Sequence, residues 1–347
     1  MTTSILQTEI DEQPAAVARF LADQSATADR LVRDLRPRDI QYVLIAARGT
    51  SDNAARYAQY VLGAYNHLPV ALATPSLYTL YGTPPDLRGA LVVGISQSGR
   101  SPDIVSVLAA GRAQGRPTLA ITNAPDSPLA QAAAGVLPLG CGVERAVAAT
   151  KTYTTSLAAL ALLSVALSGD GPRRAELARV PEWMRHTLSG VASGLSRVER
   201  YRYAGRSAVI GRGFNYATAF EVALKVKELT RVVTESYSSA DFLHGPIAAL
   251  EPGCPLIVVA PSGQTLSDLT AFAAEVKRRG AELIVISDDA AVLRQAQLPL
   301  ALPTGVPEWL SPLIAALPGQ LFAMHLAAAK GLNVDQPVGL TKVTETR

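Results

Sequence analysis

The sequence predicts an α/β protein built from two tandem copies of one unit, each a mostly parallel sheet flanked by helices. Three landmarks recur at a constant offset of 164 residues. They are the Arg-Gly pairs after the apolar runs 42–46 and 208–211, the Ser-Gly pairs after the runs 91–95 and 256–260, and the starts of the runs 118–122 and 282–286. Because three landmarks at one offset are hard to obtain by chance, we infer a tandem duplication.

The elements follow from the type of apolar pattern along the chain. The six runs are continuously apolar rather than alternating, which is typical of parallel strands covered on both faces. A helical pattern at 102–114 ends at Gly115, and alternation of strands with helices predicts α/β layers. The remaining segments are an amphipathic lead-in helix at 11–35, a polar helical stretch at 173–200, a Pro-rich loop at 303–318, a helix at 321–330 and a tail at 331–347.

The domain organisation follows from this pattern and from the length of 347 residues, which favours two domains. It consists of a helical lead-in at 1–35, a first domain at 36–172 that binds phosphate, a helical connector at 173–200, a second domain at 201–330 and the tail at 331–347.

Composition excludes several classes of protein. Hydrophobic residues make up 48% of the chain and charged residues 18%, which excludes wholesale disorder. The net charge is +3, and without a run of five like charges we expect no nucleic-acid partner. Two distant cysteines, Cys141 and Cys254, exclude a disulfide scaffold and a thiolate zinc site, and the histidines lack metal-ligand spacing. We therefore expect neither a metal nor a cofactor.

The N-terminus is acidic where a signal peptide needs Lys or Arg, so we expect it to be unprocessed. The longest apolar run, 157–167, is too short to span a bilayer. We therefore expect a cytoplasmic protein without a membrane partner.

Two hydroxyl-rich turns, 49–53 and 96–103, follow strands of the first copy, and each opens a helix. In open parallel sheets, ligands bind beyond the carboxyl ends of the strands, and helix N-termini attract anions. Hydroxyl groups add donors for a phosphate, although they could also serve only as helix caps. Since one copy carries two such turns, the pattern favours phosphate binding.

The second copy has lost most of these donors. Phe214 and Asn215 stand at the positions equivalent to Thr50 and Ser51. Ala260 and Pro261 stand at those equivalent to Ser96 and Gln97. Neither turn is a nucleotide-binding P-loop or a dinucleotide fingerprint. The sequence therefore assigns phosphate binding to the first copy alone.

The predicted helix 216–228 carries Glu221, Lys225 and Glu228 within one narrow arc. By itself this stripe is typical of ion pairs on a solvated face, but it begins just after a strand end, where a ligand is expected. His244 stands in a Gly-Pro turn and suits proton transfer near neutral pH. Lys342 lies in the tail, where an exposed ammonium without a role is the ordinary expectation, although lysine can form imines with sugar carbonyls.

Six stretches of this sequence together resemble tandem sugar isomerase (SIS) domain proteins over about residues 35–347. They are ARGTSDNA, GISQSGRSPD, ERAVAATKTYTTSL, GRGFNYATAFEVALKVKEL, HGPIA and NVDQPVGLTKVT. Within the family, the chain is similar to the isomerase half of glucosamine-6-phosphate synthases and to the stand-alone SIS-type deaminases. The resemblance implies two doubly wound, flavodoxin-like SIS domains.

The resemblance also implies roles for residues of this chain. Glu228 would move a proton between C1 and C2, His244 would assist ring opening at the neighbouring subunit's site, and Lys342 could form an imine with the open-chain sugar. A homodimer with shared active sites follows from the role of His244. The residues that would hold the phosphorylated amino sugar are Thr50, Ser51, Ser96, Gln97, Ser98, Ser101, Val147, Thr150, Glu221 and Lys225.

Two departures from the synthases indicate a reaction without glutamine. Met1-Thr2 offers no terminal thiol, so we expect no glutaminase activity by the synthases' route. Ala149 replaces a serine of the synthases and Arg100-Ser101-Pro102 follows the phosphate turn, as in the stand-alone deaminases. The hypothesis is hydrolytic deamination of glucosamine 6-phosphate to fructose 6-phosphate and ammonia. The alternatives are the same chemistry on galactosamine 6-phosphate or a fructosamine 6-phosphate, isomerisation without loss of nitrogen, and a non-catalytic sugar-phosphate sensor.

Overall fold

The computed structural model describes residues 4–36 and 38–342, so the end of the predicted tail, 343–347, and the first three residues of the lead-in lie outside the described residues. The chain forms two compact units. The first-repeat unit comprises residues 15–144, 151–178 and 341–342, and the second-repeat unit comprises residues 4–14, 145–150 and 179–340. Each unit contains one five-stranded sheet in which every pairing is parallel.

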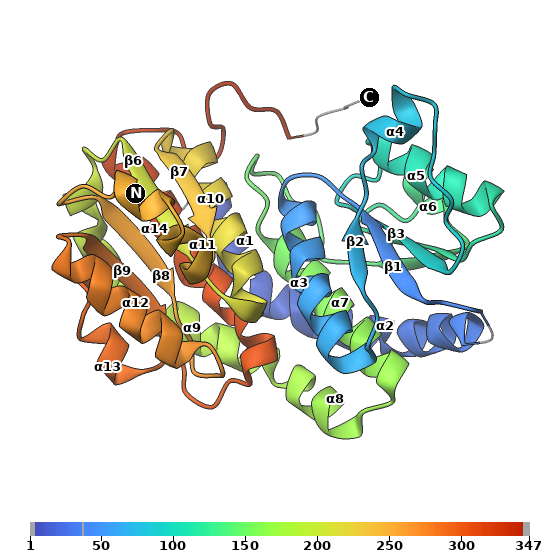
Figure 1. Cartoon of the computed structure of the whole chain (residues 1–347), viewed down its shortest axis with the longest axis horizontal. Helices are drawn as coiled ribbons and strands as arrows, with labels where there is room; N and C mark the ends of the chain where they lie inside the picture. The colour runs from blue at the N-terminus through green and yellow to red at the C-terminus, as the bar shows by residue number, and fades with distance from the viewer. Residues whose placement is uncertain (1–3, 37, 343–347) are drawn as a thin grey trace. The chain divides into compact units, whose positions relative to one another are not determined.

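The sheet of the first-repeat unit has the order β2-β1-β3-β4-β5. Helices α3 and α7 pack together on one face, and α5 and α6 pack on the other (Figure 1). The elements are α2 (Gln13–Leu35), β1 (Tyr42–Ala46), α3 (Thr50–Asn66), β2 (Val70–Leu72), α4 (Ser76–Thr79), β3 (Ala90–Ser96), α5 (Pro102–Ala113), β4 (Thr118–Thr122), α6 (Pro128–Ala132), β5 (Gly135–Pro138), α7 (Lys151–Ser168) and α8 (Gly171–Ala178).

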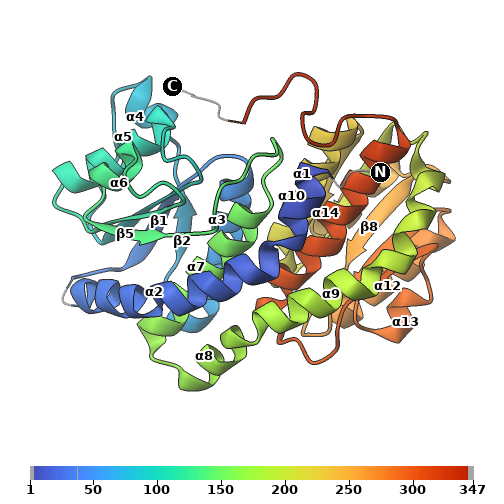
Figure 2. The ribbon, with the colours of Figure 1, turned by 180° about the vertical axis from the view of Figure 1, so that it is seen from behind.

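The second-repeat unit has the same topology, because its order β7-β6-β8-β9-β10 matches the first strand for strand. Helices α9, α10 and α14 lie behind the sheet and α12 and α13 in front, as the two views show (Figure 2). The elements are α1 (Ile5–Asp11), α9 (Val180–Leu195), η1 (Ser196–Tyr201), β6 (Arg206–Ile210), η2 (Gly213–Asn215), α10 (Tyr216–Thr230), β7 (Val233–Tyr237), α11 (Ser239–Leu243), η3 (Pro246–Ala249), β8 (Pro255–Val259), α12 (Leu266–Arg278), β9 (Glu282–Ser287), α13 (Ala290–Leu293), β10 (Leu298–Ala301), η4 (Glu308–Leu310) and α14 (Ser311–Ala329).

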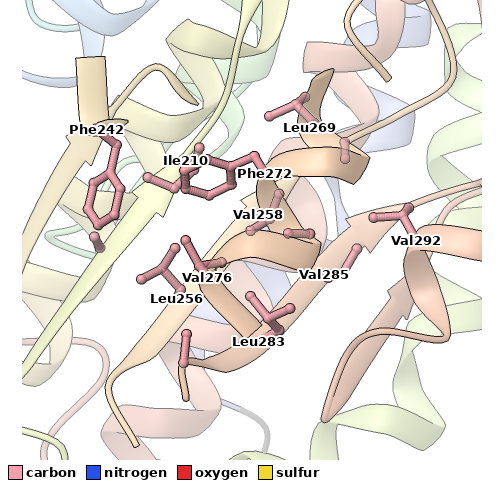
Figure 3. Packing of buried hydrophobic residues seen from close by; sticks show 14 residues of the cluster. Ile210, Phe242, Leu256, Val258, Leu269, Phe272, Val276, Leu283, Val285 and Val292 are labelled. Carbon is pink, nitrogen blue, oxygen red and sulfur yellow. The ribbon is translucent and has the colours of Figure 1, made fainter. Parts of the chain in front are cut away.

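This topology confirms the predicted α/β fold with two copies of one parallel sheet. The central strands of both sheets are buried almost throughout, as expected when helices cover both faces. Alternate residues of β6, β8 and β9 form one buried hydrophobic cluster with residues of α12. Val258 and Val285 of the strands belong to it together with Phe272 of the helix (Figure 3). The strand order is the flavodoxin-like one. In folds with this order, ligands bind at the switch point, which corresponds here to β1/β3 in the first sheet and β6/β8 in the second.

The predicted loop at 303–318 is wrong in its second half, because α14 begins at Ser311. Pro312 stands at the first turn, where a missing N–H costs nothing. Pro318 lies inside the helix, and burial of nearly the whole helix offsets the one lost hydrogen bond. Of the described helices, only Glu308–Ala329 is long and apolar enough to cross a membrane by length and composition, and 83% of its apolar window is buried within the fold. This burial is that of a core helix, so it gives little support for a membrane span.

Candidate functional site

The two hydroxyl-rich turns of the first-repeat unit lie after the neighbouring strands β1 and β3. Gly49, with φ of 52°, is the N-cap of α3, so Thr50 and Ser51 are the first two residues of the helix itself. Ser101 is the N-cap of α5, yet its side chain makes no capping hydrogen bond. Helix capping therefore does not explain these hydroxyl groups, and their position at the start of two helices suits an anion.

The turn after β3 is fixed by the backbone of Gly99. Its φ of 62° is a left-handed conformation, and a Cβ atom there would overlap the side chain of Ser127. Its N–H donates to Ser96 Oγ at 3.1 Å, while its carbonyl accepts from Leu129 N at 3.0 Å. These contacts leave Gln97 and Ser98 at the tip of the turn, partly exposed.

An ion pair ties the two turns together. Arg48, directly after β1, donates from Nε to Asp103 Oδ2 at 2.7 Å. Asp103 is fully buried in the first turn of α5, while half of the Arg48 side chain is exposed. Beside it, burial raises the pKa of Asp52 despite the opposing charges of Arg56 and Arg48. Sequence reasoning used Arg48 only as a repeat landmark and missed the pair, although the quoted stretches ARGTSDNA and GISQSGRSPD contain its two members.

Lys342 is not an isolated ammonium, because its Nζ donates to Glu144 Oε2 at 2.9 Å. The Glu144 side chain is fully buried and the Lys342 side chain is 23% exposed. Thr152, at the start of α7, donates its N–H to Glu144 Oε1 at 3.1 Å and its hydroxyl to Oε2 at 2.8 Å. The expectation of an exposed, unpaired Lys342 is therefore wrong, and Glu144 is a residue that sequence reasoning missed.

Val147 and Thr150 belong to the second-repeat unit, in the segment 145–150. The buried carboxylate of Glu9 accepts the N–H groups of Arg145 at 2.5 Å and Ala146 at 3.3 Å. The N–H of Val147 donates to the carbonyl of Asp335 at 3.2 Å. Contacts distant in sequence thus fix the segment that the resemblance assigns to the sugar.

The predicted stripe on α10 is buried, so the alternative of a solvated face is wrong. The side chains of Glu221 and Lys225 are 0% and 1% exposed, and only Glu228, at 24%, reaches the surface. Lys225 Nζ lies 2.5 Å from Glu228 Oε2 and 3.6 Å from Glu221 Oε1. Two carboxylates thus share one buried ammonium, and the outer carboxylate, that of Glu228, is the one that is partly exposed. His244, the C-cap of α11, is exposed in the same unit.

The second-repeat turn contains its own anion. Glu308 Oε2 accepts the N–H of Gln264, just before α12, at 2.8 Å, and Oε1 accepts the hydroxyl of Thr265 at 3.4 Å. The carboxylate lies so close to Gly263 that a Cβ atom there would overlap it. The neighbouring N–H of Ser262 donates to Asp288 at 2.7 Å. Internal carboxylates thus satisfy the donors of this turn, which fits its loss of hydroxyl groups.

Comparisons with known proteins match most of the chain. Residues 38–166 and 201–330 each match the family model of the SIS domain. The isomerizing glutamine–fructose-6-phosphate aminotransferase of Gloeobacter violaceus is 34% identical over 351 residues, covering 96% of this chain and 57% of that protein. The chain therefore spans little more than half the length of this relative.

Solved structures match the chain over nearly its whole length. The C-terminal domain of glucosamine-fructose-6-phosphate aminotransferase from Francisella tularensis matches with a TM-score of 0.88 and 28% identity, covering 97% of this chain and 99% of that chain. A glucosamine-6-phosphate deaminase from Thermotoga maritima matches with a TM-score of 0.82 at 19% identity, covering 99% of this chain and 100% of that chain. The second likeness concerns the fold alone.

Proposed function

Since the chain belongs to the SIS domain family, we propose that it converts an amino-sugar phosphate by isomerisation and hydrolytic deamination, with glucosamine 6-phosphate as substrate and fructose 6-phosphate and ammonia as products. The observation that carries the proposal is the buried stripe on α10, in which only Glu228 reaches the surface. A solvated row of ion pairs would have no such gradient of exposure. The aminotransferase relatives are named for fructose 6-phosphate, the proposed product.

The turns of the first-repeat unit hold the phosphate in this proposal. Hydroxyl groups of Ser51, Ser96, Ser98 and Ser101 and the amide of Gln97 donate to its oxygens, while Thr50 shapes the turn after β1. Two helix N-termini add the favourable end of their dipoles. Anchoring the phosphate fixes the sugar's orientation before any bond changes.

Glu228 moves the proton in this proposal. Ring opening, assisted by His244, exposes the C1 aldehyde, which acidifies the proton on C2. Glu228 removes that proton, and reprotonation at C1 leaves an imine at C2. Lys225, 2.5 Å from Glu228 Oε2, holds the carboxylate in place, and Glu221 holds Lys225 from the other side. Such a positioned base contributes about 10²–10⁴-fold to a rate.

Lys342 acts at C2 in this proposal. Attack of its amine on the C2 imine expels ammonia and leaves the sugar bound to Lys342 as an imine, which water then hydrolyses to fructose 6-phosphate. An imine of Lys342 at C1 would instead leave the lysine nitrogen bonded to C1 after the proton shift. Atom balance therefore favours C2.

The test is to incubate the protein with glucosamine 6-phosphate, without glutamine, and to follow ammonia and fructose 6-phosphate together. Stoichiometric release of both is expected. Glu228→Gln should lower turnover by about 10²–10⁴-fold while glucosamine 6-phosphate still raises its melting temperature. A fully active Glu228→Gln variant would contradict the assigned base. Thermal stabilisation of the wild type without either product would favour another amino sugar or a sensor.

The exposed position of His244 supports a second part of the proposal, a homodimer in which His244 serves the partner's site. Sedimentation of the active protein should give a dimer. Mixing inactive Glu228→Gln and His244→Ala proteins should restore part of the activity through hybrid dimers. A fully active monomer would contradict this arrangement.

A further inference from the structure

We propose that Glu144 is the counter-ion of Lys342, holding its ammonium in the resting protein and keeping the imine protonated once the sugar is attached. The inference rests on the proposed function, in which Lys342 forms that imine. It goes further, because it names Glu144 as the residue that positions the Lys342 nitrogen and keeps it positively charged in the imine.

The surroundings of Glu144 stabilise its negative charge. Its side chain is fully buried, and both of its oxygens are occupied by hydrogen-bond donors. Thr152 supplies an N–H and a hydroxyl at the N-terminus of α7, a helix of 18 residues whose dipole favours negative charge there. Oε2 is then left pointing at Lys342 Nζ, 2.9 Å away. The carboxylate therefore stays supported when the nitrogen changes its bonding.

The charge balance of imine formation requires such a partner. An ammonium and the C2 carbonyl of fructose 6-phosphate give a protonated imine and water, so one positive charge is present before and after. One proton must leave the nitrogen before it attacks and must reach the departing hydroxyl afterwards. Glu144 is within hydrogen-bond distance to carry that proton, and it returns to the anionic form. A nearby anion also favours the protonated imine over the neutral one.

Other charged groups around Glu144 do not replace it. Lys151 lies at the start of α7 and its Nζ donates to the carbonyl of Val143 at 2.8 Å, while Arg19 of α2 donates to the carbonyl of Gly140 at 3.2 Å. Burial and, secondarily, the charge of Glu144 raise the pKa of Cys141 to about 12, so this thiol stays neutral near pH 7. None of these three neighbours is a carboxylate, and the carboxylate of Glu9 accepts the N–H groups of Arg145 and Ala146, which follow Glu144 in the chain.

The experiment traps the imine with fructose 6-phosphate and cyanoborohydride between about pH 5.5 and 9, a window around the ordinary pKa of histidine and below that of lysine. The adduct on Lys342 is quantified by peptide mass spectrometry. Wild-type protein should be labelled at Lys342 and Lys342→Arg should not. In Glu144→Gln, labelling at neutral pH should fall by about tenfold or more, and its decline with rising pH should begin about one unit lower. Glu144→Asp should recover part of both effects.

Two controls separate the counter-ion role from damage to the fold. Asp29→Asn removes a carboxylate that pairs with Arg174 at 2.5 Å in the same unit, and it should label as the wild type does. Fructose 6-phosphate should raise the melting temperature of Glu144→Gln as it does that of the wild type. Unchanged labelling in Glu144→Gln would overturn the inference, and so would a lower yield with an unchanged pH profile.

The two proposals can fail separately. If glucosamine 6-phosphate gives ammonia but no adduct forms on wild-type Lys342, deamination stands and the counter-ion role is overturned. If the adduct forms with the expected pH profile but no ammonia is released, the counter-ion role stands and the proposed reaction is wrong.

Discussion

The turns after the corresponding strands β3 and β8 have the same place in the two repeats and opposite chemistry. In the first repeat, Ser98 and Ser101 present hydroxyl groups, and Ser101 does not use its own to cap α5. In the second, the carboxylate of Glu308 accepts from the start of α12. The second copy thus satisfies the donors of its turn with carboxylates from its own chain. The proposed function assigns recognition of an external anion to the first copy alone.

The sharpest way to break the first turn is Gly99→Ala. The change combines a left-handed backbone angle with overlap against Ser127, so we expect a loss of about 2–5 kcal/mol in the free energy of unfolding. Gly115→Ala is the matched control, since its φ of 68° is also left-handed but no atom lies within 4 Å of the added Cβ. It should cost about 1–2 kcal/mol. Equal losses in urea unfolding would show that the contact with Ser127 does not matter.

The two Arg–Asp pairs are the next comparison. Asp103 is fully buried against Arg48, whereas Arg212 and Asp268, the corresponding pair of the second repeat, are 41% and 42% exposed. Asp103→Ala should cost about 2–3 kcal/mol, because it removes a buried, charged hydrogen bond. Asp268→Ala should cost no more than about 1 kcal/mol, as exposed pairs do. Urea unfolding measures both losses of stability. A larger loss in Asp268→Ala than in Asp103→Ala would contradict the argument that burial makes the first pair the more stabilising one.

The sequence predicted the framework well because the framework is repetitive. Apolar runs at a fixed offset determine which segments become parallel strands, and the structure confirms all six. The prediction of a loop at 303–318 failed at Pro318, because proline has a low helix propensity and only tertiary burial stabilises the helix there.

The site was less accessible to sequence reasoning, because its electrostatics depend on partners distant in the chain. Glu144 and Lys342 are 198 positions apart, so no local pattern joins them. Glu308 likewise stands 44 positions from Gln264. Charge stripes on one helix can be recognised from spacing, whereas their burial depends on the neighbouring helices. The spacing therefore predicted the stripe on α10, but it did not predict that Glu221 and Lys225 are buried.

Removing one hydroxyl group should separate the functions of the two turns. Ser98→Ala should raise the KM for the sugar phosphate by about 10–100-fold, the equivalent of one hydrogen bond to a charged group. Ser262→Ala, at the corresponding position of the second repeat, should leave KM unchanged, because the turn there is held through the Ser262 N–H and Asp288. Steady-state kinetics on both variants is the measurement. A rise in KM for Ser262→Ala would mean that both copies bind the phosphate.

The smallest effect concerns the internal anion itself. Glu308→Gln keeps an oxygen that can accept from Gln264 N–H and loses only the charge, so the free energy of unfolding should fall by about 1 kcal/mol. Glu308→Ala removes the acceptor as well and should cost more. Both variants should keep the wild-type KM for the sugar phosphate, measured on the folded protein. A change in KM without a change in stability would contradict the structural role of Glu308. It would indicate that Glu308 acts on the substrate instead of satisfying the donors of its own turn.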